Sequence, residues 1–133
     1  MSTGWGGLHN TDLPDHVFKV EAVPHDWLFP QMSAVVHHGG AGTTAAGVRA
    51  GVPSILTPFF GDQPFWGWRV NQLGVGPKAI PHKKLSAQRL AQAIEVAIKD
   101  EGIRRNATKL GKLIQAEDGV LNAIVALRNW QEI

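Results

Sequence analysis

The sequence contains no cysteine among its 133 residues, which excludes disulfide bonds and thiolate metal sites. It also lacks a secretion-type leader and any apolar run long enough to cross a bilayer. Charge bias is weak, because 13 Lys and Arg residues oppose 11 Asp and Glu residues. The basic pairs at 83–84 and 104–105 are interpreted as isolated, solvated surface, so nucleic acid is not an expected partner. Together these absences predict a soluble, cytoplasmic protein without a transmembrane segment.

What is present indicates one ordered domain over residues 1–133. A hydrophobic content of 44% and a charged content of 18% are typical of a globular chain and not of a disordered one. Residues 2–8, STGWGGL, look like the turn that follows a strand, yet no strand precedes them. We therefore expect the domain to be truncated at its N-terminus.

The alternation of strand and helix patterns predicts an α/β fold with a parallel sheet. Short apolar or β-branched runs predict strands, and 3.6-residue periodicity with capping residues predicts helices. The expected strands are 17–23, 34–36, 54–59 and a weaker edge strand at 75–80. The expected helices are a short one within 24–32 capped by Asp26, then 42–50, 64–73, and a helical C-terminal part from about residue 86.

The most informative stretch is residues 34–51, AVVHHGGAGTTAAGVRAG. It predicts a buried strand, a glycine-rich turn and a helix that opens near Gly42. A helix N-terminus offers unpaired backbone N–H groups and the positive end of its dipole, which suits a phosphate. The alternative is a purely structural turn, since glycine runs mark many such turns.

The surroundings of this turn favour a ligand site. His25, the turn at 37–42 and the turn at 61–63 each follow a predicted strand directly. Ligands of open parallel sheets bind at the carboxyl ends of the strands, so three polar turns are expected on one edge.

Three segments in this order, HHGGAGTT, RAGVPSILTPFFGDQ and RVNQLGVG, resemble the C-terminal, donor-binding half of the UDP-glycosyltransferase superfamily. The resemblance covers roughly residues 5–98 and is greatest to the sterol 3-beta-glucosyltransferases and their bacterial relatives. It implies the GT-B architecture, in which two Rossmann-like domains with parallel sheets flanked by helices face a cleft. It also implies transfer with inversion of the sugar's anomeric configuration.

The resemblance assigns donor-binding roles residue by residue. His38 and the turn after it match the diphosphate contacts, Asp62 and Gln63 match the pair that hydrogen-bonds sugar hydroxyls, and His25 matches a position near the nucleoside. The complete implied set is His25, His38, Gly40, Ala41, Gly42, Thr43, Asp62 and Gln63. No metal or other cofactor is implied, because the nucleotide sugar is a co-substrate. No catalytic residue is assigned, because the family's general base is a histidine of the N-terminal domain.

Two positions depart from the plant members of the family. Ala22 stands where they carry a tryptophan that stacks on uracil, and Ala46 stands where they carry a glutamate for the ribose hydroxyls. Trp27 is interpreted as a core anchor and not as a replacement platform. His37 is interpreted as a packing residue at the end of its strand. Further residues are assigned to packing (Phe59, Phe60, Phe65, Trp66, Trp68) or to the surface (His9, His16, His82). For Trp66 and Trp68 the alternative is that they face the N-terminal domain or the acceptor cleft.

These interpretations predict a domain that binds UDP-glucose or a similar UDP-sugar within an inverting hexosyltransferase acting on a lipid, sterol or other hydroxyl acceptor. The expected partner is an N-terminal acceptor-binding domain of the same or another chain, and peripheral membrane association through that part is left open. Alone, the chain is expected to bind UDP weakly and to be inactive. Two alternatives remain, a stand-alone nucleotide-sugar module and a non-catalytic interaction subunit. A dinucleotide site is not indicated, because no GxGxxG with a following acidic residue is present.

Overall fold

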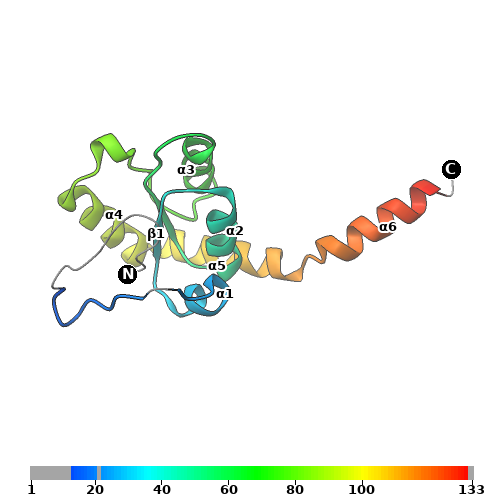
Figure 1. Ribbon diagram of the computed structural model, residues 1–133, viewed down its shortest axis with the longest axis horizontal. Coiled ribbons are helices and arrows are strands. Elements are labelled where there is room, and N and C mark those ends of the chain that lie inside the picture. Colours follow the sequence, from blue (N-terminus) through cyan, green and yellow to red (C-terminus); the bar gives the residue numbers. More distant parts are fainter. Residues whose placement is uncertain (1–12, 21, 132–133) are drawn as a thin grey trace.

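The computed structural model describes residues 13–20 and 22–131 of the chain (Figure 1). The predicted turn at residues 2–8 and His9 lie outside the described residues. The element order is α1 (His25–Leu28), η1 (Phe29–Gln31), β1 (Val35–His37), α2 (Ala41–Ala50), β2 (Ser54–Leu56), α3 (Gln63–Gln72), η2 (His82–Lys84), α4 (Ala87–Lys99), α5 (Glu101–Ala116) and α6 (Gly119–Gln131). The α/β class with parallel strands is therefore confirmed.

Strands β1 and β2 pair in parallel, with Val35 opposite Ser54 and His37 opposite Leu56. Because side chains alternate along a strand, these four residues point to one face of the sheet and Ile55 points to the other. Ile55 packs with Ala93 and Ala97 of α4, whereas Leu56 packs with Val70 and Ala107 from α3 and α5. Helices thus cover both faces, which leaves the strand ends as the place where polar loops gather.

The strand predicted at residues 17–23 is wrong. Within its described residues the structure forms only an isolated bridge at Val20, and residue 21 lies outside the description. The apolar alternation is incomplete, and Phe18 remains mostly exposed instead of entering the core. A local β-type composition does not make a strand unless the segment is buried against the sheet.

The edge strand predicted at residues 75–80 is also absent, although its chain does run beside β2. Ser54 N–H donates to the Val75 carbonyl at 3.2 Å, and Ile80 N–H donates to the Leu56 carbonyl at 2.9 Å. Between these two bonds lies Pro77, which has no N–H to continue a ladder. Strand β2 itself ends at Leu56, earlier than the predicted 59.

Most predicted helix ends are confirmed. Ser86 Oγ accepts from Arg89 N–H at 3.2 Å and caps α4. Gly51 ends α2 in the left-handed conformation, with φ of 73°. The cap predicted at Asp26 is wrong, because Pro24 occupies the N-cap position of α1 and Asp26 lies in its first turn. Asp26 instead accepts from the neighbouring Trp27 N–H at 3.0 Å.

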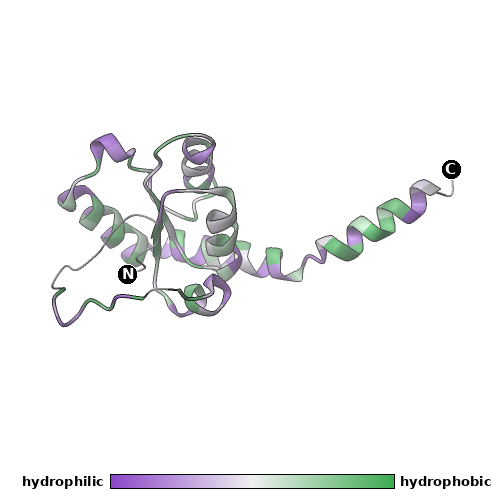
Figure 2. Cartoon of the chain, in the orientation of Figure 1, coloured by the Kyte–Doolittle hydropathy of each residue, from purple (hydrophilic) through white to green (hydrophobic). Residues whose placement is uncertain are grey.

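Helix α6 extends away from the rest of the molecule, so we call it the arm (Figure 1). Its sequence is largely apolar, and Figure 2 shows hydrophobic residues along much of its length. These side chains stay exposed, including Leu127 and Trp130 at 63% and 77%. No helix within the described residues combines the length and apolarity that a membrane crossing requires.

Candidate functional site

The first turn (residues 37–43) joins β1 to α2 through a backbone that only glycine fits. Gly39 has a φ of 93°, in the left-handed region that side chains disfavour. A Cβ added there would lie 2.9 Å from Leu56 Cδ2 and 3.3 Å from the Gln63 carbonyl oxygen. Its N–H donates to His37 Nδ1 at 3.1 Å. The turn is therefore fixed by backbone conformation, packing and a hydrogen bond.

The turn delivers the chain into α2 with an open N-terminus. Gly40 is the N-cap, and no side chain caps the helix. Ala41 and Gly42 are exposed, and a Cβ added at Gly42 would meet nothing within 4 Å. The N–H groups of a first helical turn have no intrahelical acceptor, and the helix dipole adds positive potential there. The geometry is suited to an anion such as a phosphate.

His38 lies beside this N-terminus. The side chain is exposed, and its Nε2 would be 2.5 Å from a Cβ added at Gly40, so the imidazole folds back over the turn. Thr43 is half-buried in the first turn of α2. A ring N–H and a hydroxyl thus accompany the backbone amides predicted to bind a diphosphate.

His37, which was interpreted as packing, is part of the turn's structure. Burial is the largest cause that lowers its pKa to about 4, and the neighbouring His38 and His25 lower it further. The ring is consequently neutral at physiological pH. His25, at the start of α1, stacks on the buried Phe29 with ring centroids 4.4 Å apart, and it is close enough to His37 to influence the pKa of that ring.

The second turn (residues 57–63) joins β2 to α3. Gln63 is only 7% exposed, and its Oε1 accepts from Phe59 N–H at 2.8 Å and Phe60 N–H at 3.3 Å. Its side-chain oxygen therefore holds the turn together, and the amide NH₂ is the part that can reach a ligand. Asp62 is exposed, and its Oδ2 accepts from Trp66 Nε1 at 2.8 Å, so Oδ1 can face a ligand.

The two turns meet at the same edge of the sheet. They adjoin at Gly39, because the Gln63 carbonyl oxygen borders the space that a Cβ there would fill. At their bases, Thr57 N–H donates to the His37 carbonyl at 2.9 Å, which continues the pairing of the two strands. The structure thus brings the open N-terminus of α2 next to the Asp62–Gln63 pair. We call this edge, formed by the first and second turns, the rim.

The positions that depart from the plant pattern offer no substitute contacts. Ala22 is exposed, and Ala46 packs on the cluster of Phe29, Val35 and Val52. Trp27 is not the predicted core anchor, because 62% of its surface is exposed. A short helix of one turn leaves most of its side chains outside, which sequence spacing alone could not reveal.

The packing predicted for Phe59, Phe60 and Phe65 near the second turn is wrong, and the exposure of Trp68 agrees with its alternative. Phe60 is 76% exposed, and Phe59, Phe65 and Trp68 are about half exposed, whereas Trp66 packs on the core as predicted. Phe59 stacks on His82 with ring centroids 4.7 Å apart. These rings form an apolar border beside Asp62.

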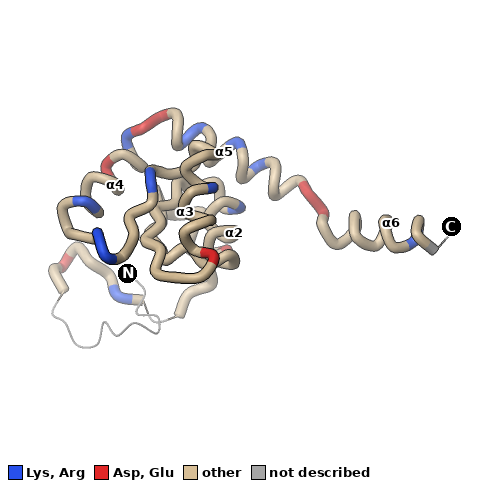
Figure 3. The backbone as a smooth tube through the Cα atoms, turned by 90° about the horizontal axis from the view of Figure 1, so that it is seen from above, with Lys and Arg blue, Asp and Glu red and all other residues tan. Residues whose placement is uncertain are grey.

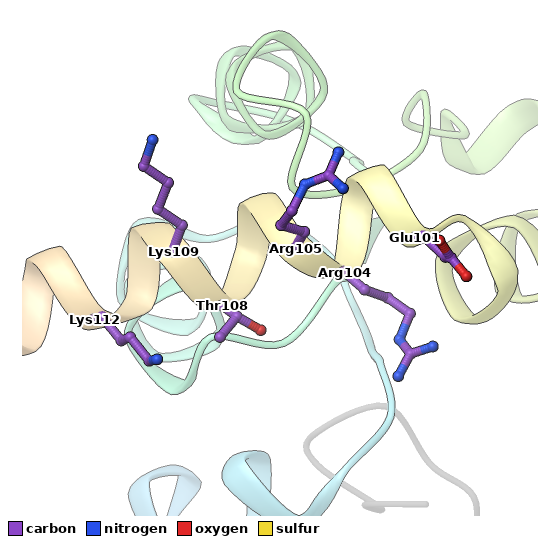
Figure 4. Close-up of a pocket in the computed structure, with 6 residues that line it drawn as sticks. All are labelled: Glu101, Arg104, Arg105, Thr108, Lys109 and Lys112. Carbon is purple, nitrogen blue, oxygen red and sulfur yellow. The ribbon is translucent and has the colours of Figure 1, made fainter.

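A broad surface hollow of about 570 Å³ lies elsewhere, along α5 (Figure 4). Its lining residues are Glu101, Arg104, Arg105, Thr108, Lys109 and Lys112. The pair at 104–105 is thus not isolated, because helical spacing adds further lysines to it, as the run of basic positions along α5 shows (Figure 3). In Figure 4 Arg105 and Lys109 point to one side of the helix while Arg104 and Lys112 point to the other. These divergent side chains do not form a convergent binding site.

Three comparisons place this geometry among known proteins. The family described as "Erythromycin biosynthesis protein CIII-like, C-terminal domain" matches residues 7–121. Sterol 3-beta-glucosyltransferase UGT80B1 of Arabidopsis thaliana is 52% identical over 128 residues, covering 95% of this chain and 21% of that protein. Sterol 3-beta-glucosyltransferase of Saccharomyces cerevisiae is 50% identical over 121 residues, covering 91% of this chain and 10% of that protein.

Among solved structures, the glycosyltransferase VinC in complex with dTDP superimposes with a TM-score of 0.78 at 29% identity. The match covers 89% of this chain and 30% of VinC. The chain therefore spans about a fifth of its plant relative and less than a third of this structural neighbour.

Proposed function

The chain belongs to the erythromycin biosynthesis protein CIII-like C-terminal domain family, and from this premise we propose that it binds the UDP-sugar donor of a glycosyltransferase. The resemblance to GT-B glycosyltransferases stated from the three sequence segments is confirmed by this membership and by the structural neighbours. The observation that carries the proposal is that the first and second turns adjoin, with the Gln63 carbonyl oxygen beside the space that a Cβ of Gly39 would fill. This arrangement supports the proposal because the open N-terminus of α2, suited to a diphosphate, then lies near polar groups suited to a polyol.

In this proposal the diphosphate lies at the N-terminus of α2. The amides of Ala41, Gly42 and Thr43 and the ring of His38 donate to its oxygens. As the bond between the sugar and the diphosphate breaks, negative charge grows on the leaving oxygen, and fixed donors stabilise that charge. This arrangement supplies positive potential from the protein itself, so we expect binding without a metal ion.

The sugar then lies over the second turn. Asp62 Oδ1 accepts from hydroxyl groups, and the Gln63 amide donates to them. The acceptor's hydroxyl oxygen bonds to the anomeric carbon from the side opposite the leaving diphosphate, the carbon–oxygen bond to the diphosphate breaks, and UDP leaves with the electron pair. This route inverts the anomeric configuration, and the hydroxyl proton passes to a general base outside this chain.

We further propose glucose as the sugar and a sterol, lipid or similar alcohol as the acceptor, on the strength of the sterol 3-beta-glucosyltransferases that this chain resembles. Acceptor binding requires a second domain. The exposed apolar side chains of the arm support such a partner, because a helix with many exposed apolar residues gains free energy when another surface covers them. We expect this chain alone to bind UDP weakly and to transfer no sugar.

Isothermal titration calorimetry with UDP tests the proposal. We expect His38→Ala and Asp62→Ala to differ in a diagnostic way. His38→Ala weakens the binding of UDP, because it removes a hydrogen-bond donor to the diphosphate. Asp62→Ala weakens the binding of UDP-glucose and leaves the binding of UDP unchanged. The matched controls are His16→Ala and Asp15→Ala, which remove the same side chains from exposed positions outside both turns. Failure of the wild-type chain to bind UDP, or equal losses in the controls, would refute the proposed site.

A further inference from the structure

Three buried polar side-chain atoms have no hydrogen-bond partner in the described part of the chain. They are His37 Nε2, Thr44 Oγ1 and Ser54 Oγ. Ser54 is fully buried and Thr44 is nearly so. Buried polar groups are normally paired, so a concentration of unpaired ones indicates a constraint that outweighs their cost.

Two of these atoms converge below the first turn. His37 and Ser54 lie on the face of the sheet that α2 covers, and both face Gly47 of that helix. A Cβ added at Gly47 would lie 2.7 Å from Ser54 Oγ and 4.0 Å from His37 Nε2. The imidazole is thus oriented with Nε2 toward the interior and with Nδ1 toward the turn.

The Nδ1 end identifies the tautomer. Gly39 N–H donates to Nδ1, so Nδ1 carries no proton and Nε2 carries it. A protonated imidazole has donors at both nitrogens and cannot accept this bond. Burial, which is the main reason that the pKa of His37 falls to about 4, therefore preserves the acceptor.

We propose that His37 is the positioning residue of the first turn: its neutral ring accepts from Gly39 N–H and thereby directs His38 and the first amides of α2 toward the ligand. Three groups surround Gly39: Nδ1 accepts its N–H, and the Leu56 methyl group and the Gln63 carbonyl oxygen border the space that a Cβ would fill. Of these three groups, only Nδ1 forms a hydrogen bond with the backbone N–H of Gly39, the residue before the N-cap of α2. Without it the left-handed turn loses its polar anchor, although packing around Leu56 persists.

The consequence for the ligand rests on the proposed function, since it assumes that the turn binds a nucleoside diphosphate. The hydrogen bond between Gly39 N–H and His37 Nδ1 does not depend on that assumption. It can be measured without ligand, by the ¹⁵N shifts of the His37 ring and by hydrogen exchange of the Gly39 amide.

The test compares His37→Leu with His37→Asn in the full 133-residue chain. Asn keeps a side-chain oxygen that can accept from the N–H two residues later, whereas Leu has a similar size and no acceptor. We expect His37→Leu to speed Gly39 exchange by about 5- to 30-fold, the range expected when one such bond is lost. The affinity of His37→Leu for UDP should fall in parallel. His37→Asn should recover both the exchange protection and UDP binding.

Ser54→Ala is the matched control, because it removes a buried polar group from the same face without touching the Gly39 bond. We expect it to leave Gly39 exchange unchanged. Ring ¹⁵N shifts that place the proton on Nδ1 in the wild type would overturn the proposal. The same Gly39 exchange rate and UDP affinity in His37→Leu and wild type would also overturn it. So would an Asn variant that behaves like the Leu variant. If wild type shows the expected tautomer and exchange but does not bind UDP, the proposed function fails and the positioning role stands.

Discussion

The rim and the arm leave opposite kinds of groups exposed. At the rim, side chains such as those of His37 and Gln63 are used to hold the backbone, and the amides at the start of α2 are left open. On the arm, the helix satisfies its own backbone, and apolar side chains such as Leu127 are left open. The first arrangement suits a polar, anionic ligand and the second suits an apolar surface. One chain therefore presents two surfaces that suit chemically different partners.

The largest expected difference between the two regions concerns stability. Leu56 is buried between the two turns and the core, so Leu56→Ala should lower the free energy of unfolding by about 2–5 kcal/mol. Leu127→Ala removes the same atoms from the exposed arm and should change it by less than about 0.5 kcal/mol. Denaturant unfolding of both variants measures the contrast. Similar losses would mean that the arm packs on the body.

Acid should lower the free energy of unfolding through protonation of His37. The pKa of His37 is about 4 in the folded chain and near 6.5 when unfolded, so the unfolded chain binds more protons between these values. Stability is therefore complete above pH 6.5 and falls as the pH drops toward 4, with a ceiling of about 3 kcal/mol for this group. His38 and His25 face the same ring and contribute to the shift.

Denaturant unfolding at several pH values measures this loss, and His37→Asn should flatten the profile while His16→Asn leaves it unchanged. The arm contains no histidine, so histidine titration there cannot cause the loss. A loss that His37→Asn removes and His16→Asn retains therefore reports on the rim. A profile that His37→Asn does not alter would contradict the assignment.

The packing of the first turn can be separated from its backbone strain. Gly39→Ala places a Cβ in a left-handed residue and against Leu56, and we expect a loss of about 2 kcal/mol together with weaker UDP binding. Gly61→Ala has a similar φ of 66° but open space around the new atom, so we expect about 1 kcal/mol. Equal losses would show that Leu56 and Gln63 do not constrain the first turn.

The smallest contrast concerns helix caps. Ser86 caps the packed α4, so Ser86→Ala should lower global stability by about 1 kcal/mol. Asp118 Oδ1 accepts from Leu121 N–H at 2.9 Å and caps the arm. Asp118→Ala should speed hydrogen exchange within α6 without changing global unfolding, because the arm opens locally. A global loss from Asp118→Ala would contradict this independence.

The first turn and several helix ends could be predicted because their signals are local. A glycine turn after an apolar strand, the cap at Ser86 and the helix stop at Gly51 each depend on a few neighbouring residues. The failures depend on distant ones. The segment at 75–80 runs beside β2 yet forms no strand because Pro77 interrupts the bonding, and 17–23 has a strand-like composition without burial.

The roles of individual side chains were harder to predict than the elements. Sequence context could place Gln63 at the second turn but could not reveal that its oxygen is used by Phe59 and Phe60. His37 was assigned to packing because a histidine at a strand end carries no pattern that marks Nδ1 as an acceptor. Trp27 and Phe60 are predicted to pack because they are large and apolar, whereas the one-turn helix α1 and the second turn leave both side chains mostly exposed.

The two turns are proposed to form a single site for a nucleotide sugar. The most direct test is an NMR titration of the ¹⁵N-labelled chain with UDP-glucose. We predict that the amides of Gly39 to Thr43 and of Asp62 shift together with one saturation curve, while those of the arm stay unchanged. Shifts confined to Arg104, Lys109 and their neighbours on α5, or separate curves for the two turns, would contradict the claim.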